Sequence, residues 1–163
     1  MGNEFVKKND EREARCYYRA SVFYAAGAIE AFVNYIADSF AKANNLTQHE
    51  ICFLNDKTLV FKFDDGLREE TKYNPLDQKL RFLIRKFVHN FDFQGSTWVA
   101  FMEFKKLRDL LAHPRQLDDE TISDEYRKKV AKGLKAIIEL MSAVTEGMFQ
   151  KPLRRQLLDL IPD

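Results

Sequence analysis

The sequence predicts an all-α protein, an up-and-down bundle of four long helices with additional short helices and a small β-hairpin insertion. Three observations predict this class. Apolar residues recur at helical spacing in four long segments. Only six glycines and four prolines interrupt the chain, while fourteen phenylalanines offer large side chains for helix packing. With 163 residues the chain can bury a core, so we expect one domain over residues 1–163.

The first long helix is predicted from Glu11 to about Asn44. Its middle, from Tyr17 to Phe40, is apolar nearly all round, which predicts burial against several neighbours or a second subunit. One narrow polar stripe interrupts it, made of Glu30, Asn34 and Asp38. The stripe is either the solvent-facing side of the helix or the edge of a functional cleft, because a carboxylate deep in an apolar run is costly unless it is paired.

Start and stop signals place the remaining helices. Thr47 and Glu50 have the spacing of a capping box, which predicts a short helix from Gln48 to about Asn55. Three further starts are predicted at Asn74-Pro75 with Asn74 as cap, at Gly95-Ser96, and at Thr121 or Ser123. The helix after Gly95 should run to about Ala112, and the last long helix should end before Pro152, followed by a short amphipathic tail.

An insertion is predicted over about residues 56–73. Residues 58–63 alternate like a strand, and Asp65-Gly66 is a turn signal typical of hairpins. The return arm is strongly charged and is equally compatible with irregular structure. A small β-hairpin is therefore one of two structures open to this segment.

Composition restricts the partners. The net charge is +1, so no overall basic field drives nucleic-acid binding and any RNA affinity must come from a local cluster. The first residues are polar and no apolar run reads as long and continuous enough to span a bilayer, so we expect a cytoplasmic protein without a membrane partner. Cys16 and Cys52 lie in apolar surroundings without metal spacing, which favours reduced core thiols over a disulfide. No cofactor is expected.

The residues with the clearest chemistry lie in the segment 104–115, at the end of the predicted 97–112 helix. Pro114 disfavours helical backbone at His113, so the helix should unwind there and carry the imidazole towards Arg108. Asp109 lies four residues before His113 and should hydrogen-bond one ring nitrogen. Lys105 shares a helix face with Arg108, and Arg115 adds a further positive charge.

This pattern resembles the Arg-x4-His motif of the HEPN superfamily, in which an arginine, a polar residue, three more residues and a histidine end a bundle helix. Here it reads Arg108-Asp109-Leu110-Leu111-Ala112-His113. Residues 20–32 also resemble the first helix of HEPN proteins. The resemblance covers about residues 14–149 and is specific at 104–115, whereas the insertion departs from a minimal bundle.

The resemblance implies a metal-independent endoribonuclease with Arg108 and His113 as catalytic residues. It also implies a homodimer whose shared cleft holds two copies of the motif, and a toxin or defence role restrained by an antitoxin partner. A histidine can act as base or acid on RNA near neutral pH, and an arginine can hold two phosphate oxygens. Lys105 and Arg115 would help to offset the negative end of the helix, and Glu30 would lie at the edge of the cleft.

Two alternatives remain open from the sequence. HEPN domains also serve as non-catalytic modules that bind a nucleotide or a partner protein and dimerise. The third interpretation is a structural helical interaction domain, in which Arg108 pairs with a carboxylate such as Glu30 or Asp109 and His113 caps the last carbonyls of the helix.

Overall fold

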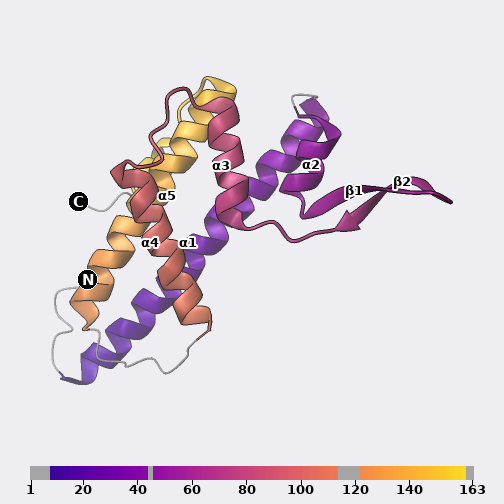
Figure 1. Cartoon of the computed structure of the whole chain (residues 1–163). Helices are drawn as coiled ribbons and strands as arrows, with labels where there is room; N and C mark the ends of the chain where they lie inside the picture. Colours follow the sequence, from indigo (N-terminus) through magenta and orange to yellow (C-terminus); the bar gives the residue numbers. More distant parts are fainter. Residues whose placement is uncertain (1–7, 44–45, 114–121, 161–163) are drawn as a thin grey trace.

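The computed structural model of the protein describes residues 8–43, 46–113 and 122–160. The described chain is mostly helical and carries one small antiparallel sheet, so the predicted helical class is confirmed (Figure 1). Its elements are α1 (Lys8–Ala43), α2 (Gln48–Leu54), β1 (Lys57–Lys62), β2 (Gly66–Thr71), α3 (Leu76–Phe87), α4 (Ser96–Ala112), α5 (Ser123–Phe149) and α6 (Arg155–Leu158).

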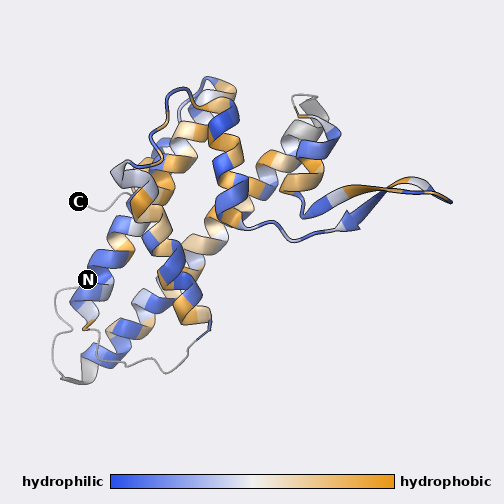
Figure 2. Ribbon diagram, in the orientation of Figure 1, coloured by the Kyte–Doolittle hydropathy of each residue, from blue (hydrophilic) through white to orange (hydrophobic). Residues whose placement is uncertain are grey.

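The core lies where the long helices meet. Helices α1, α4 and α5 pack against one another, α3 packs on α5 and α1, and α2 packs on α1. The buried apolar residues form one contiguous cluster to which all five of these helices contribute. Figure 2 shows how hydrophobic and hydrophilic residues share the circumference of the long helices, as their periodicity predicts. Side chains that are fully buried in this cluster include Ile29, Val33, Leu80, Ile84, Ile137 and Leu140.

Helix α1 is buried on one side only. Val22, Ile29 and Ile36 are fully buried, whereas Tyr24 and Tyr35 are 81% and 65% exposed. Neighbours within the single chain cover only one side of this helix, and the predicted alternative, burial against a second subunit, stays a prediction. The segment Glu11–Ser39 is also long and apolar enough to cross a membrane by length and composition alone, which corrects the prediction that no such stretch exists. Helices that pack in the core of a soluble protein pass the same test.

The predicted start of α2 is confirmed, but other predicted caps are not. Thr47 and Glu50 form the capping box that places the start of α2 at Gln48. The N-cap of α3 is Pro75 rather than Asn74, because the Asn74 side chain instead donates to the Phe53 carbonyl at 2.9 Å. Tertiary contacts have here taken over a residue that local propensity assigns to a cap.

The start of α5 shows the same effect. Its N-cap is Ile122, and the Ser123 backbone N–H and hydroxyl both donate to the Glu11 carboxylate of α1. These bonds lower the pKa of Glu11. The other predicted cap, Thr121, lies outside the described residues. Ser123 therefore joins two helices instead of capping one.

Residues 57–71 form the predicted hairpin. Lys57 pairs with Thr71, and Phe61 pairs with Leu67 near the turn, where Gly66 has a positive φ of 71°. The hairpin projects away from the helices beyond α2 (Figure 1). Its base is anchored, because the Lys72 N–H donates to the Asp56 carbonyl at 2.8 Å.

The two cysteines have different environments. Cys52 is buried, as predicted, and burial raises the pKa of its thiol, with Glu69 adding to the effect. Cys16 is exposed on α1, so its prediction as a core thiol is wrong. Both are free thiols in the structure.

Helix α4 approaches α5 closely at Gly133. A Cβ built on Gly133 would lie 2.2 Å from Phe104 Cδ2 and 2.8 Å from Phe104 Cβ, so only a hydrogen fits between the two helices. Phe104 itself is buried and precedes Arg108 by one helical turn. The close approach at Gly133 therefore helps to set where the motif lies.

Gly133→Ala is expected to destabilise the fold by about 1–3 kcal/mol, because Phe104 or the helix backbone must shift to accept the methyl group. Helix propensity acts in the opposite direction by about 1 kcal/mol. Gly27→Ala is the matched control, since no heavy atom of the described residues lies within 4 Å of the added Cβ, and it should stabilise α1. Equilibrium unfolding in denaturant measures both. An unchanged midpoint for Gly133→Ala would show that the helices do not meet this closely.

Candidate functional site

The predicted motif lies in the last turns of α4 and in the residue that ends the helix. His113 is the C-cap, with φ −126° and ψ 70°, and its N–H still donates to the Asp109 carbonyl at 3.0 Å. The helix therefore unwinds where the following Pro114 predicts it. The imidazole is exposed. Pro114 and Arg115 lie outside the described residues.

Arg108 lies between a carboxylate from α1 and one from its own helix. Its Nη2 is 3.3 Å from Glu30 Oε1 and its Nη1 is 3.3 Å from Asp109 Oδ1. The side chain is 22% exposed, and its Nε is buried without a hydrogen-bond partner among the described residues. Strong charge-assisted hydrogen bonds span about 2.7–2.9 Å. The guanidinium is thus positioned by two long contacts, and its buried Nε–H has no hydrogen-bond partner among the described residues.

Lys105 extends the same charged cluster. Its Nζ is 3.4 Å from Asp77 Oδ1 at the start of α3 and 3.4 Å from Asp109 Oδ2. Burial disfavours the charged ammonium, but the two carboxylates outweigh it and raise the pKa of Lys105. Lys105 and Arg108 share Asp109, so the prediction that they lie on one face is confirmed. Asp77 was not predicted, because nothing in the local spacing brings α3 to this end of α4.

One predicted contact is wrong. The Asp109 carboxylate contacts Lys105 and Arg108, and no hydrogen bond joins it to the His113 ring among the described residues. Arg108 and Lys105 line a pocket of about 10 Å³, and His113 does not line it. That the unwound end of α4 brings the imidazole to the guanidinium stays a prediction.

The polar stripe on α1 faces solvent and also reaches the charged cluster around Arg108. Glu30, Asn34 and Asp38 are all exposed, which agrees with a solvent-facing side. Glu30 also contacts Arg108 and, with Asn34, lines a polar pocket of about 120 Å³ beside Tyr73 and Lys79. Its carboxylate therefore borders the charged cluster as well as the solvent.

The basic residues of α3 are engaged in structural contacts. Lys79 is buried and its Nζ lies 2.7 Å from Asp56 Oδ2. Arg81 stacks over Phe93 and Trp98, with its guanidinium carbon 4.7 Å and 4.9 Å from the two ring centroids. These two side chains are therefore engaged with groups of the protein itself.

Comparison of the chain with protein-family models, with curated proteins and with solved structures found no match. Within residues 8–43, 46–113 and 122–160 no group of three or more His, Cys, Asp and Glu side chains is placed to hold a metal ion. What the site offers chemically is one arginine, one lysine and one exposed histidine, together with three carboxylates that offset the two cations.

Glu30→Gln should tighten binding of a single-stranded RNA oligonucleotide about two- to fivefold. The carboxylate competes with phosphate for Arg108, and a charge pair at this distance in a wet site is worth about 1 kcal/mol. The fold should persist, because such partly exposed pairs contribute about 0–1 kcal/mol. Asp38→Asn removes the same charge from an exposed position of the same helix. Fluorescence anisotropy at several salt concentrations compares them, and equal effects would show that Glu30 does not compete for Arg108.

Proposed function

We propose that this protein is a metal-independent endoribonuclease of the HEPN type, acting as a homodimeric four-helix bundle. The observation that carries the proposal is the arrangement at the end of α4. Arg108 is held at the surface by loose contacts to Glu30 and Asp109, while His113 is exposed at the unwound C-cap of the same helix. These are the residue types that metal-free RNA cleavage requires, in the order of the Arg-x4-His motif.

The chemistry assigns one role to each residue. A neutral His113 accepts the proton of the ribose 2′-hydroxyl, whose oxygen then attacks the adjacent phosphorus. Arg108 stabilises the extra negative charge on the phosphorane oxygens, after exchanging its contact with Glu30 for phosphate. The bond to the 5′-oxygen breaks, and a protonated second histidine supplies that oxygen with a proton. The products are a 2′,3′-cyclic phosphate and a free 5′-hydroxyl.

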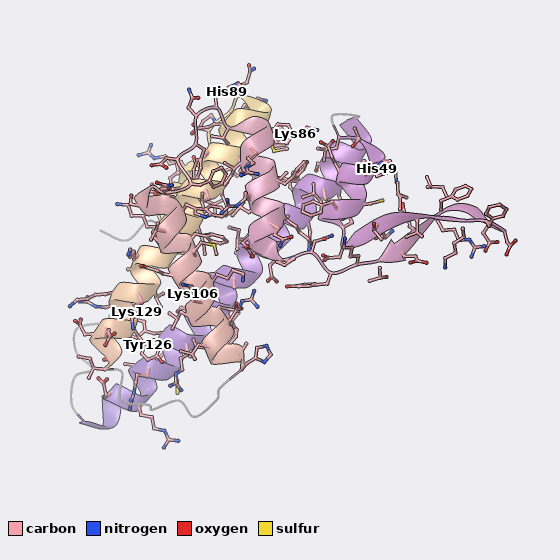
Figure 3. All side chains as sticks on the ribbon, viewed as in Figure 1. His49, Lys86, His89, Lys106, Tyr126 and Lys129 are labelled. Carbon is pink, nitrogen blue, oxygen red and sulfur yellow. The ribbon has the colours of Figure 1, made fainter. Side chains whose placement is uncertain are left out.

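The second histidine has to come from a second subunit in this proposal. His49 lies on α2 and His89 beyond the end of α3, both away from the C-terminal end of α4, as Figure 3 shows. The exposed side of α1 supports a twofold assembly, because Tyr17, Tyr24 and Tyr35 are open to solvent on one face of the helix. In this proposal the twofold contact extends around α1 towards Glu30, so that two copies of the motif lie near one another.

A second candidate is a non-catalytic HEPN module that dimerises and binds a nucleotide or a partner protein. The observation that favours it is charge compensation, since Arg108 and Lys105 are both paired with carboxylates in the single chain. A structural helical interaction domain is compatible with the same pairs. Under the enzymatic proposal, a toxin or defence role with an antitoxin partner follows from the resemblance alone.

Tyr24→Glu is expected to weaken homodimerisation at least tenfold, because it places a charge in the centre of the exposed α1 surface. The wild-type chain should sediment as a dimer at micromolar concentration. Leu160→Glu changes a leucine that is 58% exposed outside α1, and it should leave this dimer intact. A wild-type monomer at these concentrations, or equal behaviour of the two variants, would contradict an interface on α1.

His113→Ala and Arg108→Ala should each lower RNA cleavage by more than a hundredfold without unfolding the protein, since neither side chain is part of the buried apolar core. Arg108→Lys should restore little, because a point charge does not replace a two-pronged contact. His89→Ala, another exposed histidine, serves as the control. Cleavage should continue in chelator, leave a cyclic phosphate, spare DNA, and show a bell-shaped dependence on pH.

A homogeneous dimer that binds RNA but does not cut it at any pH would support the binding module instead. Cutting that survives His113→Ala and stops in chelator would assign the activity to a different site or to a contaminating nuclease. Loss of cutting in both His113→Ala and Arg108→Ala, with RNA binding retained in His113→Ala, is the result that the proposal requires.

A further inference from the structure

The tip of the hairpin exposes more apolar surface than a free hairpin would be expected to carry. Phe63 is 98% exposed, Phe61 70% and Leu67 63%. Phe61 and Leu67 are cross-strand partners, so they share one face of the two-stranded sheet. Figure 2 shows hydrophobic residues along β1 out to the far end of the hairpin. Large apolar groups gathered at an exposed tip mark an interaction surface.

The charges around this tip are mostly paired. Lys62 bonds Glu70 and Arg68 bonds Asp65, both at 2.6 Å. Asp64, directly after Phe63, makes no ion pair or hydrogen bond within the described part of the chain. The tip therefore presents an apolar knob, here defined as Phe61, Phe63 and Leu67, next to the unpaired carboxylate of Asp64.

The molecule also carries a pocket with the opposite properties. About 400 Å³ of open space lies between α4 and α5, with an apolar lining formed by Ala100, Phe104, Leu107 and Leu110. Three lysines rim it, Lys106, Lys129 and Lys132, against one glutamate, Glu103. Lys132 bonds Glu103 at 2.6 Å and Lys129 bonds Glu125 at 2.6 Å. Lys106 has no such partner among the described residues, so the rim keeps a net positive charge.

The knob and the pocket lie too far apart to meet within one chain. The hairpin extends past α2 at one side of the molecule, whereas Lys106 and Lys129 lie on α4 and α5 at the other side (Figures 1 and 3). Its base is held in this direction, because Glu69 of β2 accepts from Gln48 of α2 at 3.0 Å and bonds Lys57 at 2.7 Å. A hairpin tip that occupies the pocket must therefore belong to another copy of the chain.

We propose that the α4–α5 pocket receives the hairpin tip of a second copy of this chain. The pocket takes the apolar knob, and Lys106 pairs with Asp64 of the incoming tip. Apolar surface then covers apolar surface, and the two uncompensated charges neutralise each other at the rim, which favours one docking orientation over others. A reciprocal exchange of hairpins between two copies makes this contact isologous.

The pocket and the charged cluster around Arg108 lie on different sides of α4. Arg108 and Lys105 face the charged cluster with Glu30 and Asp77, whereas Lys106 and Leu110 line the pocket towards α5. The hairpin contact is thus separate from the ribonuclease proposal. If the protein does not cleave RNA, the hairpin proposal still stands. If the hairpin contact does not form, the catalytic assignment still stands.

Cross-linking between isotopically distinct chains tests the contact. Equal amounts of unlabelled and ¹⁵N-labelled full-length protein are mixed and treated with a carbodiimide, which joins a carboxylate to a lysine in contact with it. The expected product is a mixed-isotope peptide that links Asp64 to Lys106, Lys129 or Lys132. Phe61→Ala with Phe63→Ala should lower its yield at least tenfold, which corresponds to about 1.4 kcal/mol of contact free energy.

Charge exchange provides the second arm. Asp64→Lys and Lys106→Glu should each weaken the association measured by sedimentation, and the two changes together should restore at least part of it. Lys128→Glu reverses a lysine of α5 that does not line the pocket, so it should have little effect. Cross-links of Asp64 only within its own chain or to a different surface overturn the proposal. A purified protein that holds a small amphiphile in this pocket would also overturn the proposal. The proposal fails as well if the losses of association caused by Asp64→Lys and Lys106→Glu simply add in the double variant.

Discussion

The packing of Phe101 and Phe104 between α1 and α5 is the contact on which the rest of the structure depends. Both phenylalanines are nearly fully buried, and Phe104 lies against Gly133, where any larger residue would collide with it. Interiors packed this closely transmit small displacements rather than absorbing them. Arg108 follows Phe104 by one turn of the same helix, so the position of its guanidinium next to Glu30 of α1 is a consequence of how α4 is held in the core.

The ion pairs of the protein differ in length and burial, and these differences distinguish a structural pair from the contacts of the candidate site. The Lys79–Asp56 pair is short, at 2.7 Å, and its lysine is buried, so removing Asp56 would leave a buried ammonium unpaired. The contacts of Arg108 with Glu30 and Asp109 are longer, at 3.3 Å, and partly exposed. An incoming anion can displace contacts of the second kind at low cost. Charge compensation at Arg108 therefore does not by itself argue against phosphate binding, provided that the anion reaches the guanidinium.

Sequence patterns predicted those parts of the structure that depend on local physics. The long helices follow from apolar periodicity, α2 from the Thr47–Glu50 capping box, the hairpin from alternation and Asp65-Gly66, and the helix break at His113 from Pro114. Sequence reasoning failed where a residue distant in the chain determines the hydrogen-bond or ion-pair partner of a side chain. Asn74 and Ser123 have side chains suited to caps but bond Phe53 and Glu11 instead. Asp77 reaches Lys105 only because α3 packs near α4, and Asp109 turns to the two cations rather than to His113. No local spacing contains that information.

Exposed apolar surface recurs in this fold. In the single chain α1 leaves tyrosines open to water, and the hairpin holds aromatic side chains away from the core. Exposing such groups raises the free energy of the isolated chain in water, and burying them against a partner removes that cost. Helix α4 has its charged residues towards α1 and its apolar pocket towards α5. In the proposed dimer the reacting groups belong to different subunits, so the interface between the subunits would set the distance between these groups.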